Sequence, residues 1–410
     1  MLLPHHSSVP RQAATPEHLN QNDSGVSPER LVHRNGPVRV EVLHCDRKGL
    51  IQCGPPRKRF NTTQMSTLNS PLRFTPILKR ALWGGTRLER ELGKPAGGVS
   101  DAAESWEVCD LPGNVSVVRD GPFAGRTIRD LMKEFAKDLL GRHSHATQFP
   151  LLIKFLDASE QLSVQVHPKD PTQMPDGSMR PGKAESWFVV DADPENRMYL
   201  GLREGVDRPK LEAAAETGQF AECLHIHEAQ RGELFYLQPG TVHALGGGLL
   251  IAEIQQPSDI TYRFYDWDRT DSEGRPRELH AESAMESTNF DLGPVRPEPS
   301  RPYGERSGSA TLLKCPHFII HRHEGPEPLS LPADECMHVL IVLAGTVSQG
   351  DFQLQKGETA VIPAARTLRD WTLSSDAFLL DSHLPADWTP PGVTSRRQPD
   401  SETELYPIQS

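Results

Sequence analysis

In the first half of the chain, apolar and polar residues alternate in two short runs that a turn-rich segment separates. In the first run, LSVQVHP, every second residue is apolar, which is the period of a half-buried strand. Gln165 and His167 therefore project from one face of that strand. The second run, KAESWFVV, places Lys183, Glu185 and Trp187 on one face. A neighbouring strand could hold Glu185 opposite His167.

A third segment of this kind, LFYLQPGTVHAL, follows later in the chain. Its apolar strand ends in a Pro-Gly turn, and His243 comes directly after that turn. Two imidazoles, a carboxylate and an amide oxygen suit zinc or a similar divalent ion, with three firm ligands and room for water or substrate. A lone strand histidine more often forms an ordinary hydrogen bond. Only the combination of the three segments favours a metal site.

The motifs QVHPKD, GKAES and PGTVHAL occur in this order, with WGG before them and YRFYDWDR after them. Together they resemble the class I mannose-6-phosphate isomerases in their short bacterial form, a cupin family, from about Pro71 to Met285. The resemblance implies that Arg263, in YRFYDWDR, is a catalytic residue. It implies a set of metal ligands at Gln165, His167, Glu185 and His243.

The resemblance also implies a reaction. This is the interconversion of D-mannose 6-phosphate and D-fructose 6-phosphate through an enediolate, with one Zn²⁺ per chain or another divalent ion in its place. Such a reaction removes a weakly acidic proton and must stabilise the resulting negative charge. Arg263 could stabilise that charge or hold the phosphate, and Glu253 could point into the same pocket. Lys183, Glu253 and a metal-bound water are the candidates for moving the proton, and Lys183 is our second catalytic candidate.

Other classes of protein fit parts of this pattern. A sugar-phosphate-binding cupin without catalysis is expected to have lost a ligand or Arg263, and neither is lost. A cupin dioxygenase usually takes two ligands from an H-x-H motif, whereas the pair here is Gln165 and His167. A cupin isomerase that acts on a related sugar phosphate stays an alternative.

Two H-x-H motifs do occur elsewhere, in LHIHE and in IIHRHE. His225 and His227 fall where the family has an ordinary polar strand. His321 and His323 lie in a later segment with no partner after it. We therefore expect both pairs to lie on exposed strand faces rather than to bind metal.

The expected fold is mainly β with flanking helices: a cupin (jelly-roll) barrel that carries the metal site, and a second, degenerate cupin barrel. The later segment MHVLIVLAGTVSQGDFQLQKGETAVIPAA repeats the strand and Gly-turn pattern. It has no histidine after its proline, which predicts a metal-free barrel. The expected parts are a disordered extension over 1–66, a catalytic domain over 67–290, a linker over 291–310, the second barrel over 311–385 and a polar tail over 386–410.

Helical spacing of apolar residues predicts a helix in TIRDLMKEFAKDLL, with Thr127 as its cap and Asp130 in its first turn. We expect this helix to cover one end of the catalytic barrel. PKLEAAAETG predicts a second helix, which Gly218 closes, and PRELHAESAMES a third. Trp83 of the WGG motif is expected in the core.

Composition and charge add limits. The formal net charge of -11 argues against a general nucleic-acid binder, because phosphate contacts need a basic face. The six cysteines form no C-x-x-C pair and are expected to be free thiols. No apolar run approaches the ~20 residues of a membrane span, and no signal pattern opens the chain, so a cytoplasmic location is expected. The expected partner is a small sugar phosphate, and the sequence indicates no oligomeric state.

Overall fold

The computed structural model describes residues 67–169, 172–173, 179–180, 182–270, 273–299 and 308–390. The predicted extension over 1–66 and the tail beyond 390 lie outside the described residues. Within the described part, strands dominate and helices flank them, which confirms the predicted mainly-β class. None of the described helices is long and apolar enough to cross a membrane.

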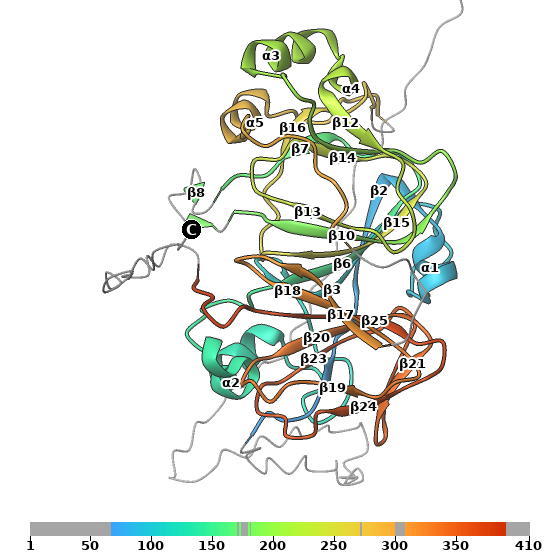
Figure 1. The fold of residues 1–410 in the computed structure, drawn as a ribbon, viewed down its shortest axis with the longest axis vertical. Helices are drawn as coiled ribbons and strands as arrows, with labels where there is room; N and C mark the ends of the chain where they lie inside the picture. The colour runs from blue at the N-terminus through green and yellow to red at the C-terminus, as the bar shows by residue number, and fades with distance from the viewer. Residues whose placement is uncertain are drawn as a thin grey trace, which may run out of the picture. The chain divides into compact units, whose positions relative to one another are not determined.

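Four antiparallel sheets, which we number I to IV, carry most of the described strands (Figure 1). Sheet I has the order β12 (Leu224–His227), β11 (Met198–Leu202), β14 (His243–Leu245), β7 (Val164–Val166) and β16 (Tyr262–Tyr265). Sheet II has the order β13 (Leu234–Leu237), β10 (Glu185–Ala192), β15 (Leu249–Gln255), β6 (Leu152–Ala158), β3 (Ala102–Val108) and β2 (Ile77–Gly85).

Sheet III has the order β1 (Leu72–Arg73), β23 (Thr359–Ile362), β20 (His338–Ala344), β25 (Phe378–His383), β18 (Ile319–Glu324) and β17 (Gly308–Lys314). Sheet IV has the order β19 (Leu329–Ser330), β24 (Asp370–Leu373), β21 (Thr346–Gln349) and β22 (Phe352–Gln355). Two short pairs complete the described strands, namely β4 (Asp110–Leu111) with β5 (Asn114–Val115) and β8 (Thr172–Gln173) with β9 (Met179–Arg180).

Alternation along the strands gives sheets I, II and III two packed faces each, whereas sheet IV packs on one face. Val164 and Val166 of β7 share a core with Phe220, in the helices that cover sheet I at the top of Figure 1. Trp187 belongs to the core between sheets I and II, whereas its neighbour Phe188 belongs to the core that joins sheets II and III. The predicted alternation in LSVQVHP and KAESWFVV is confirmed.

The predicted helices are also present. α2 (Ile128–Leu140) begins after Thr127, whose side chain accepts a hydrogen bond from the backbone N–H of Asp130. α3 (Arg208–Thr217) ends at Gly218, which takes the left-handed conformation. The third predicted helix is α5 (Ala281–Ser287). The remaining helices are α1 (Arg87–Leu92), the 3₁₀ turn η1 (Gly141–His143) and α4 (Phe220–Cys223).

The placement of α2 over an end of the catalytic barrel is wrong. The backbone carbonyls of Asp138 and Leu139, near its C-terminus, accept hydrogen bonds from the N–H groups of Ala365 and Ala364. Those residues follow β23, so α2 ends against sheet III. The reason is that an amphipathic helix pattern predicts a buried face and not the element that covers it.

Sheets III and IV enclose one apolar core that includes Leu340, Val347 and Trp371. Apart from β1, their strands begin at Gly308, slightly before the predicted start at 311. The second, degenerate barrel stays a prediction. β1 belongs to sheet III, since Leu72 pairs with Val361, although it precedes every strand of sheets I and II in sequence.

The WGG motif forms the end of β2, where neighbouring atoms leave no space for side chains on its two glycines. Trp83 is buried in the core between sheets I and II, as predicted. A Cβ atom at Gly84 would lie 2.5 Å from the backbone oxygen of Asp101, and one at Gly85 would lie 2.5 Å from Oδ2 of Asp157. Both glycines are therefore required by close approach.

Candidate metal centre

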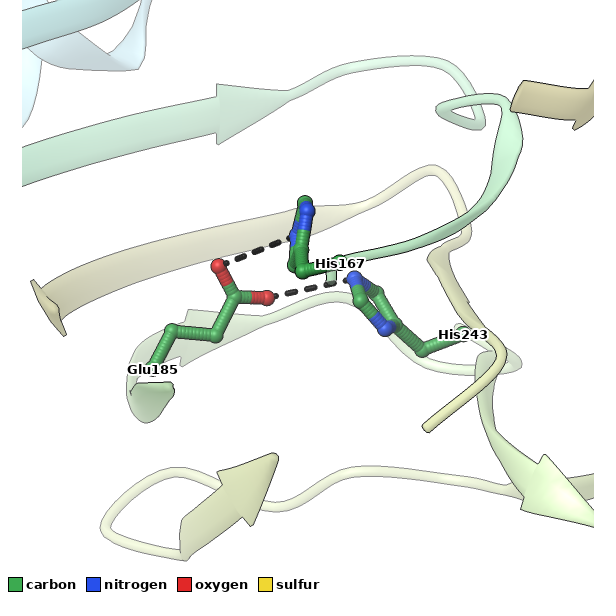
Figure 2. A group of neighbouring side chains, drawn as sticks. All are labelled: His167, Glu185 and His243. Atoms are coloured by element: carbon green, nitrogen blue, oxygen red, sulfur yellow. Dashed lines mark ion pairs between the residues drawn. The ribbon is translucent and has the colours of Figure 1, made fainter. Parts of the chain in front are cut away.

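Three buried side chains from two facing sheets meet between sheets I and II (Figure 2). His167 follows β7, His243 begins β14, and Glu185 begins β10. One ligand atom from each lies within 4.8 Å of the other two. The prediction that a strand next to His167 carries Glu185 is wrong, because β10 pairs with β13 and β15 in sheet II. Glu185 instead faces His167 from the opposite sheet.

Backbone carbonyls fix the orientation of both imidazoles. Nδ1 of His167 donates to the carbonyl oxygen of Ile260 at 2.8 Å, and Nδ1 of His243 donates to that of Thr241 at 2.8 Å. A carbonyl can only accept, so each Nδ1 carries the proton and each Nε2 carries a lone pair. The two lone pairs face Glu185: Nε2 of His167 is 3.4 Å from Oε2, and Nε2 of His243 is 3.2 Å from Oε1.

Lys183 is the cation of this group. Its Nζ lies 2.6 Å from Oε2 of Glu185 and 3.2 Å from Nε2 of His167. Apart from this ion pair, neither oxygen of the fully buried Glu185 has a hydrogen-bond partner among the residues that the structure describes. Two imidazole lone pairs and a carboxylate thus converge with one ammonium among them.

Burial controls the protonation of these groups. Burial, together with the Lys183 ammonium, lowers the pKa of His167 to about 3, so the imidazole is neutral at working pH. Burial alone would raise the pKa of Glu185, but the Lys183 ammonium holds it well below its usual range. A neutral imidazole and an ionised carboxylate are the forms in which these residues bind a metal.

These residues fit a divalent cation. Nε2 of His243 and Oε1 of Glu185 both present lone pairs at 3.2 Å and repel each other, and a cation between them would convert that repulsion into coordination. Gln165 lies directly across from His243 in the pairing of β7 with β14, and its Nε2 donates to Nε2 of His243 at 3.3 Å. A half-turn of the amide presents Oε1 instead, as a fourth ligand would require.

Arg263 lies on the other side of Gln165. It is the partner of Gln165 in the pairing of β16 with β7, so Arg263, Gln165 and His243 form one row across sheet I, on the face that looks toward sheet II. Arg263 is half-buried, and its buried Nε has no hydrogen-bond partner among the described residues. No carboxylate of the described residues forms an ion pair with it.

Glu253 does not share an adjacent strand with Arg263. β15 lies in sheet II and β16 in sheet I, so the two residues lie on facing sheets. Glu253 is buried, lies 3.0 Å from Nζ of Lys154 and accepts a hydrogen bond from Nε1 of Trp187 at 2.9 Å. It therefore belongs to an internal ion pair behind the centre.

Sequence reasoning missed Lys154 and the two carbonyls that orient the histidines. Lys154 interrupts the apolar run PLLIKFLDA, and a lysine inside a fully buried strand is a detectable signal of an internal ion pair. The carbonyls of Ile260 and Thr241 carry no sequence signal, because every residue has one.

The two H-x-H motifs lie outside this centre. Nε2 of His227 is 2.9 Å from Oε2 of Glu233 in an ordinary polar contact. His321 does have a later partner, contrary to expectation, since its Nε2 lies 3.1 Å from Nε2 of His383. His323 is buried rather than exposed.

Comparisons with known proteins agree with this geometry. Residues 72–190 match the family described as phosphomannose isomerase type I, catalytic domain. The mannose-6-phosphate isomerase of Streptococcus mutans is 31% identical over 318 residues, which cover 76% of this chain and 98% of that protein. The crystal structure of the mannose 6-phosphate isomerase from Bacillus subtilis is 30% identical, with a TM-score of 0.68, and the match covers 77% of this chain and all of that one.

A crystal structure of a mannose 6-phosphate isomerase bound with zinc and yttrium shares the fold at 17% identity, with a TM-score of 0.57, over 77% of this chain and 99% of that chain. These likenesses confirm the predicted cupin fold and the resemblance that the motifs indicated. The chain belongs to the type I mannose-6-phosphate isomerase family and is an isomerase.

Proposed function

We propose that the chain interconverts D-mannose 6-phosphate and D-fructose 6-phosphate through an enediolate, with a divalent ion, Zn²⁺ first, held by His167, Glu185, His243 and Gln165. The observation that carries the proposal is the convergence of two imidazole lone pairs on a buried carboxylate, beside an arginine without a carboxylate partner. A bound divalent ion polarises the sugar's carbonyl and hydroxyl oxygens and aligns them. The zinc-bound relative supports Zn²⁺ as the first ion to test.

The histidines are set in place before substrate arrives. Their Nδ1 protons are held by the carbonyls of Ile260 and Thr241, so no rearrangement of the rings is needed when ligand or substrate binds. Groups that are already oriented do not have to rearrange during the reaction, whereas water molecules do, and this is the advantage of a preorganised site.

Arg263 is suited to an anion. Its guanidinium is partly desolvated, stays charged at any working pH and lacks a counter-ion among the described residues. An enediolate forming between sheets I and II gains negative charge as the proton leaves carbon. We therefore assign to Arg263 the stabilisation of that charge.

Lys183 is the better of the two protein candidates for moving the proton. The carboxylate of Glu253 is already held by Lys154 and Trp187, so it is not free to approach a substrate. Nζ of Lys183 lies within 3.2 Å of the metal-ligand atoms of His167 and Glu185. Nζ of Lys183 would therefore lie next to a substrate that is held at those ligand atoms.

A coupled assay tests the proposal. The full chain is stripped with EDTA and restored with Zn²⁺, offered mannose 6-phosphate, and fructose 6-phosphate is read out. We expect activity that is lost with EDTA and regained with Zn²⁺. Binding without turnover would support a non-catalytic sugar-phosphate binder. Faster turnover of another aldose phosphate would identify a related substrate, and EDTA-resistant activity would contradict the role of the ion.

A further inference from the structure

Arg263 is assigned to the enediolate, which leaves the phosphate of the proposed substrate without a protein partner. A hexose 6-phosphate carries its phosphate at the opposite end of the carbon chain from the carbons that react. The two ends therefore need separate groups of protein atoms. Arginine side chains bind phosphate well, because their charge is permanent and their N–H groups match its oxygens. The substrate thus requires a cationic pocket near the metal centre.

A cavity of about 300 Å³ lies between the edges of sheets I and II. Ala81, Leu82 and Trp83 of β2 line one side of it, and residues that follow β16 line the other side. β2 is the edge strand of sheet II, and β16 is the edge strand of sheet I. The volume suits a phosphate group and part of the small molecule that carries it.

Arginines dominate the charge of this cavity. Among the described residues, its lining offers three guanidinium groups, from Arg269, Arg275 and Arg277, and a single carboxylate, that of Asp266. Arg269 already neutralises this carboxylate, with Nη2 at 2.6 Å from Oδ1. Arg275 pairs with Glu273 at 2.7 Å, but both side chains are about two-thirds exposed, and an exposed ion pair of this kind is weak. The cavity therefore has a surplus of positive charge.

Arg277 is the cation with the weakest pairing. Its ion pair within the described part of the chain is with Oδ1 of Asp266 at 3.9 Å, and Arg269 already holds that oxygen. The side chain of Arg277 is 42% exposed, so a ligand can reach it. Arg277 also lies close to Arg263, since burial and then the Arg277 charge lower the pKa of Arg263. An anion beside Arg277 would offset the repulsion between the two guanidinium groups.

The turn that carries Arg269 is fixed to the segment before β7. Nη1 of Arg269 donates to the carbonyl oxygen of Gln161 at 2.5 Å, and Nε1 of Trp267 donates to that of Leu162 at 2.6 Å. Trp267 and Asp268 both take the left-handed backbone conformation, with φ of 58° and 54°. Such strain persists only where surrounding contacts hold it, and it is common at ligand sites. The cavity wall is therefore set in place before a ligand binds.

The chain then folds back along β16. Thr270 pairs with Pro276 in an antiparallel bridge, which returns Arg277 to the cavity. The backbone N–H of His280 donates to the carbonyl oxygen of Arg263 at 2.8 Å, so this segment runs beside β16. Arg263 stands in the row of inward-facing residues that holds two of the proposed metal ligands. A ligand that contacts both Arg277 and the metal centre would therefore pass Arg263.

We propose that Arg277, together with Arg275, binds the phosphate group of the sugar phosphate in this cavity, while the metal centre holds the carbons that react. The identity of the sugar rests on the proposed function. The phosphate group is present in the ground state and in the transition state alike. Loss of its partner should therefore appear in KM rather than in kcat.

Steady-state kinetics of the Zn²⁺-loaded full chain provide the first test. In Arg277→Gln, KM for mannose 6-phosphate should rise about tenfold or more with little change in kcat, because a charged hydrogen-bond donor is lost. Arg275→Gln should raise KM by a smaller factor. Arg90→Gln, at an exposed arginine of α1, is the matched control and should leave both constants unchanged. Should Arg277→Gln fold poorly, the exposed Arg275 position decides the test.

Calorimetric titration of the EDTA-stripped full chain with inorganic phosphate tests the site without metal or turnover. We expect one equivalent of phosphate to bind to the wild type and to Arg90→Gln, and to bind about tenfold more weakly to Arg277→Gln. Mannose 6-phosphate should displace the phosphate, and mannose should not.

Two outcomes overturn the proposal. One is an unchanged phosphate affinity in both Arg277→Gln and Arg275→Gln, even where the isomerase assay succeeds. The other is bound phosphate that mannose 6-phosphate does not displace, because the cavity then does not serve the substrate. A chain that binds phosphate in the expected pattern without turning over mannose 6-phosphate supports the site and contradicts the proposed function.

Discussion

The indole Nε1 of Trp187 donates a 2.9 Å hydrogen bond to Oε1 of Glu253, and the same ring packs edge-on against the ring of His243 at a centroid distance of 5.2 Å. The other oxygen of Glu253 is held by Lys154 at 3.0 Å. The Lys154–Glu253 pair therefore supports the metal centre from behind, through one aromatic ring.

Glu253→Gln should destabilise the fold. The amide keeps an acceptor for Trp187 but leaves Glu104, at 3.4 Å, as the remaining ion-pair partner of the buried Lys154 ammonium among the described residues. Breaking a buried ion pair on one side costs about 3–5 kcal/mol of unfolding free energy, which urea unfolding measures. Glu104→Gln, at the more distant and more exposed carboxylate, should cost clearly less. Equal losses would show that Glu253 is not the main partner of Lys154.

His243→Ala should remove one equivalent of bound metal together with the isomerase activity. The variant deletes one of the two lone pairs that face Glu185. Elemental analysis of the purified protein and the coupled assay measure the two losses. His225→Ala, on β12 of the same sheet, should change neither. An unchanged metal content in His243→Ala would exclude this residue as a ligand.

Arg263→Lys keeps the charge but loses the planar donor group. If Arg263 stabilises the enediolate, kcat should fall by roughly 10²-fold or more, the scale for removal of a preorganised donor. A rise in KM with unchanged kcat would instead indicate a grip on the phosphate. A lower melting temperature with ordinary kinetics would indicate packing alone. Arg80→Lys, at an exposed ion pair with Asp101, is the matched control and should leave the kinetics unchanged.

Lys183→Met should lower kcat by about 10²-fold or more if the ammonium moves the proton. Metal content should not fall, because the variant removes the cation that competes for Glu185 and His167. Lys210→Met, on the exposed side of α3, should behave as wild type. Normal turnover in a well-folded Lys183→Met protein would leave the proton transfer to another group.

Gly85→Ala should lower the unfolding free energy by about 1–3 kcal/mol, as overpacking typically does. The new methyl group would meet Oδ2 of Asp157 at 2.5 Å, and that oxygen accepts a hydrogen bond from the backbone N–H of Arg87, the first residue of α1. Gly293→Ala is the control, since a Cβ there meets nothing within 4 Å. Thermal unfolding of the two variants measures the difference in stability. Equal melting temperatures would show that the backbone around Gly85 relaxes to accommodate the methyl group.

The alternation of apolar and polar residues predicted which side chains share a face. Val164 and Val166 point to the helices and Gln165 to sheet II, as the pattern required. Alternation does not predict which strands are neighbours, because every strand with the same pattern is compatible with every other. Glu185 therefore reached His167 from the opposite sheet rather than from the next strand.

The contact between His338 and His383 at the end of sheet III could not be predicted for a related reason. His338 and His383 become neighbours through the register of β20 with β25, and nothing in their spacing along the chain indicates that register. Lys154 is different, because its charge inside an apolar run was visible in the sequence. Its partner Glu253 lies on the next strand of sheet II, which only the fold identifies.

The pairing of β1 with β23 makes the N-terminal strand a structural part of the C-terminal half. A fragment that starts at the predicted linker would leave the N–H and C=O groups along one side of β23 open, since Leu72 and Arg73 would be missing. Open strand edges recruit other chains. The two halves are thus not exchangeable modules. A shuffled or truncated version of this protein would self-associate at that edge before it lost its catalytic activity.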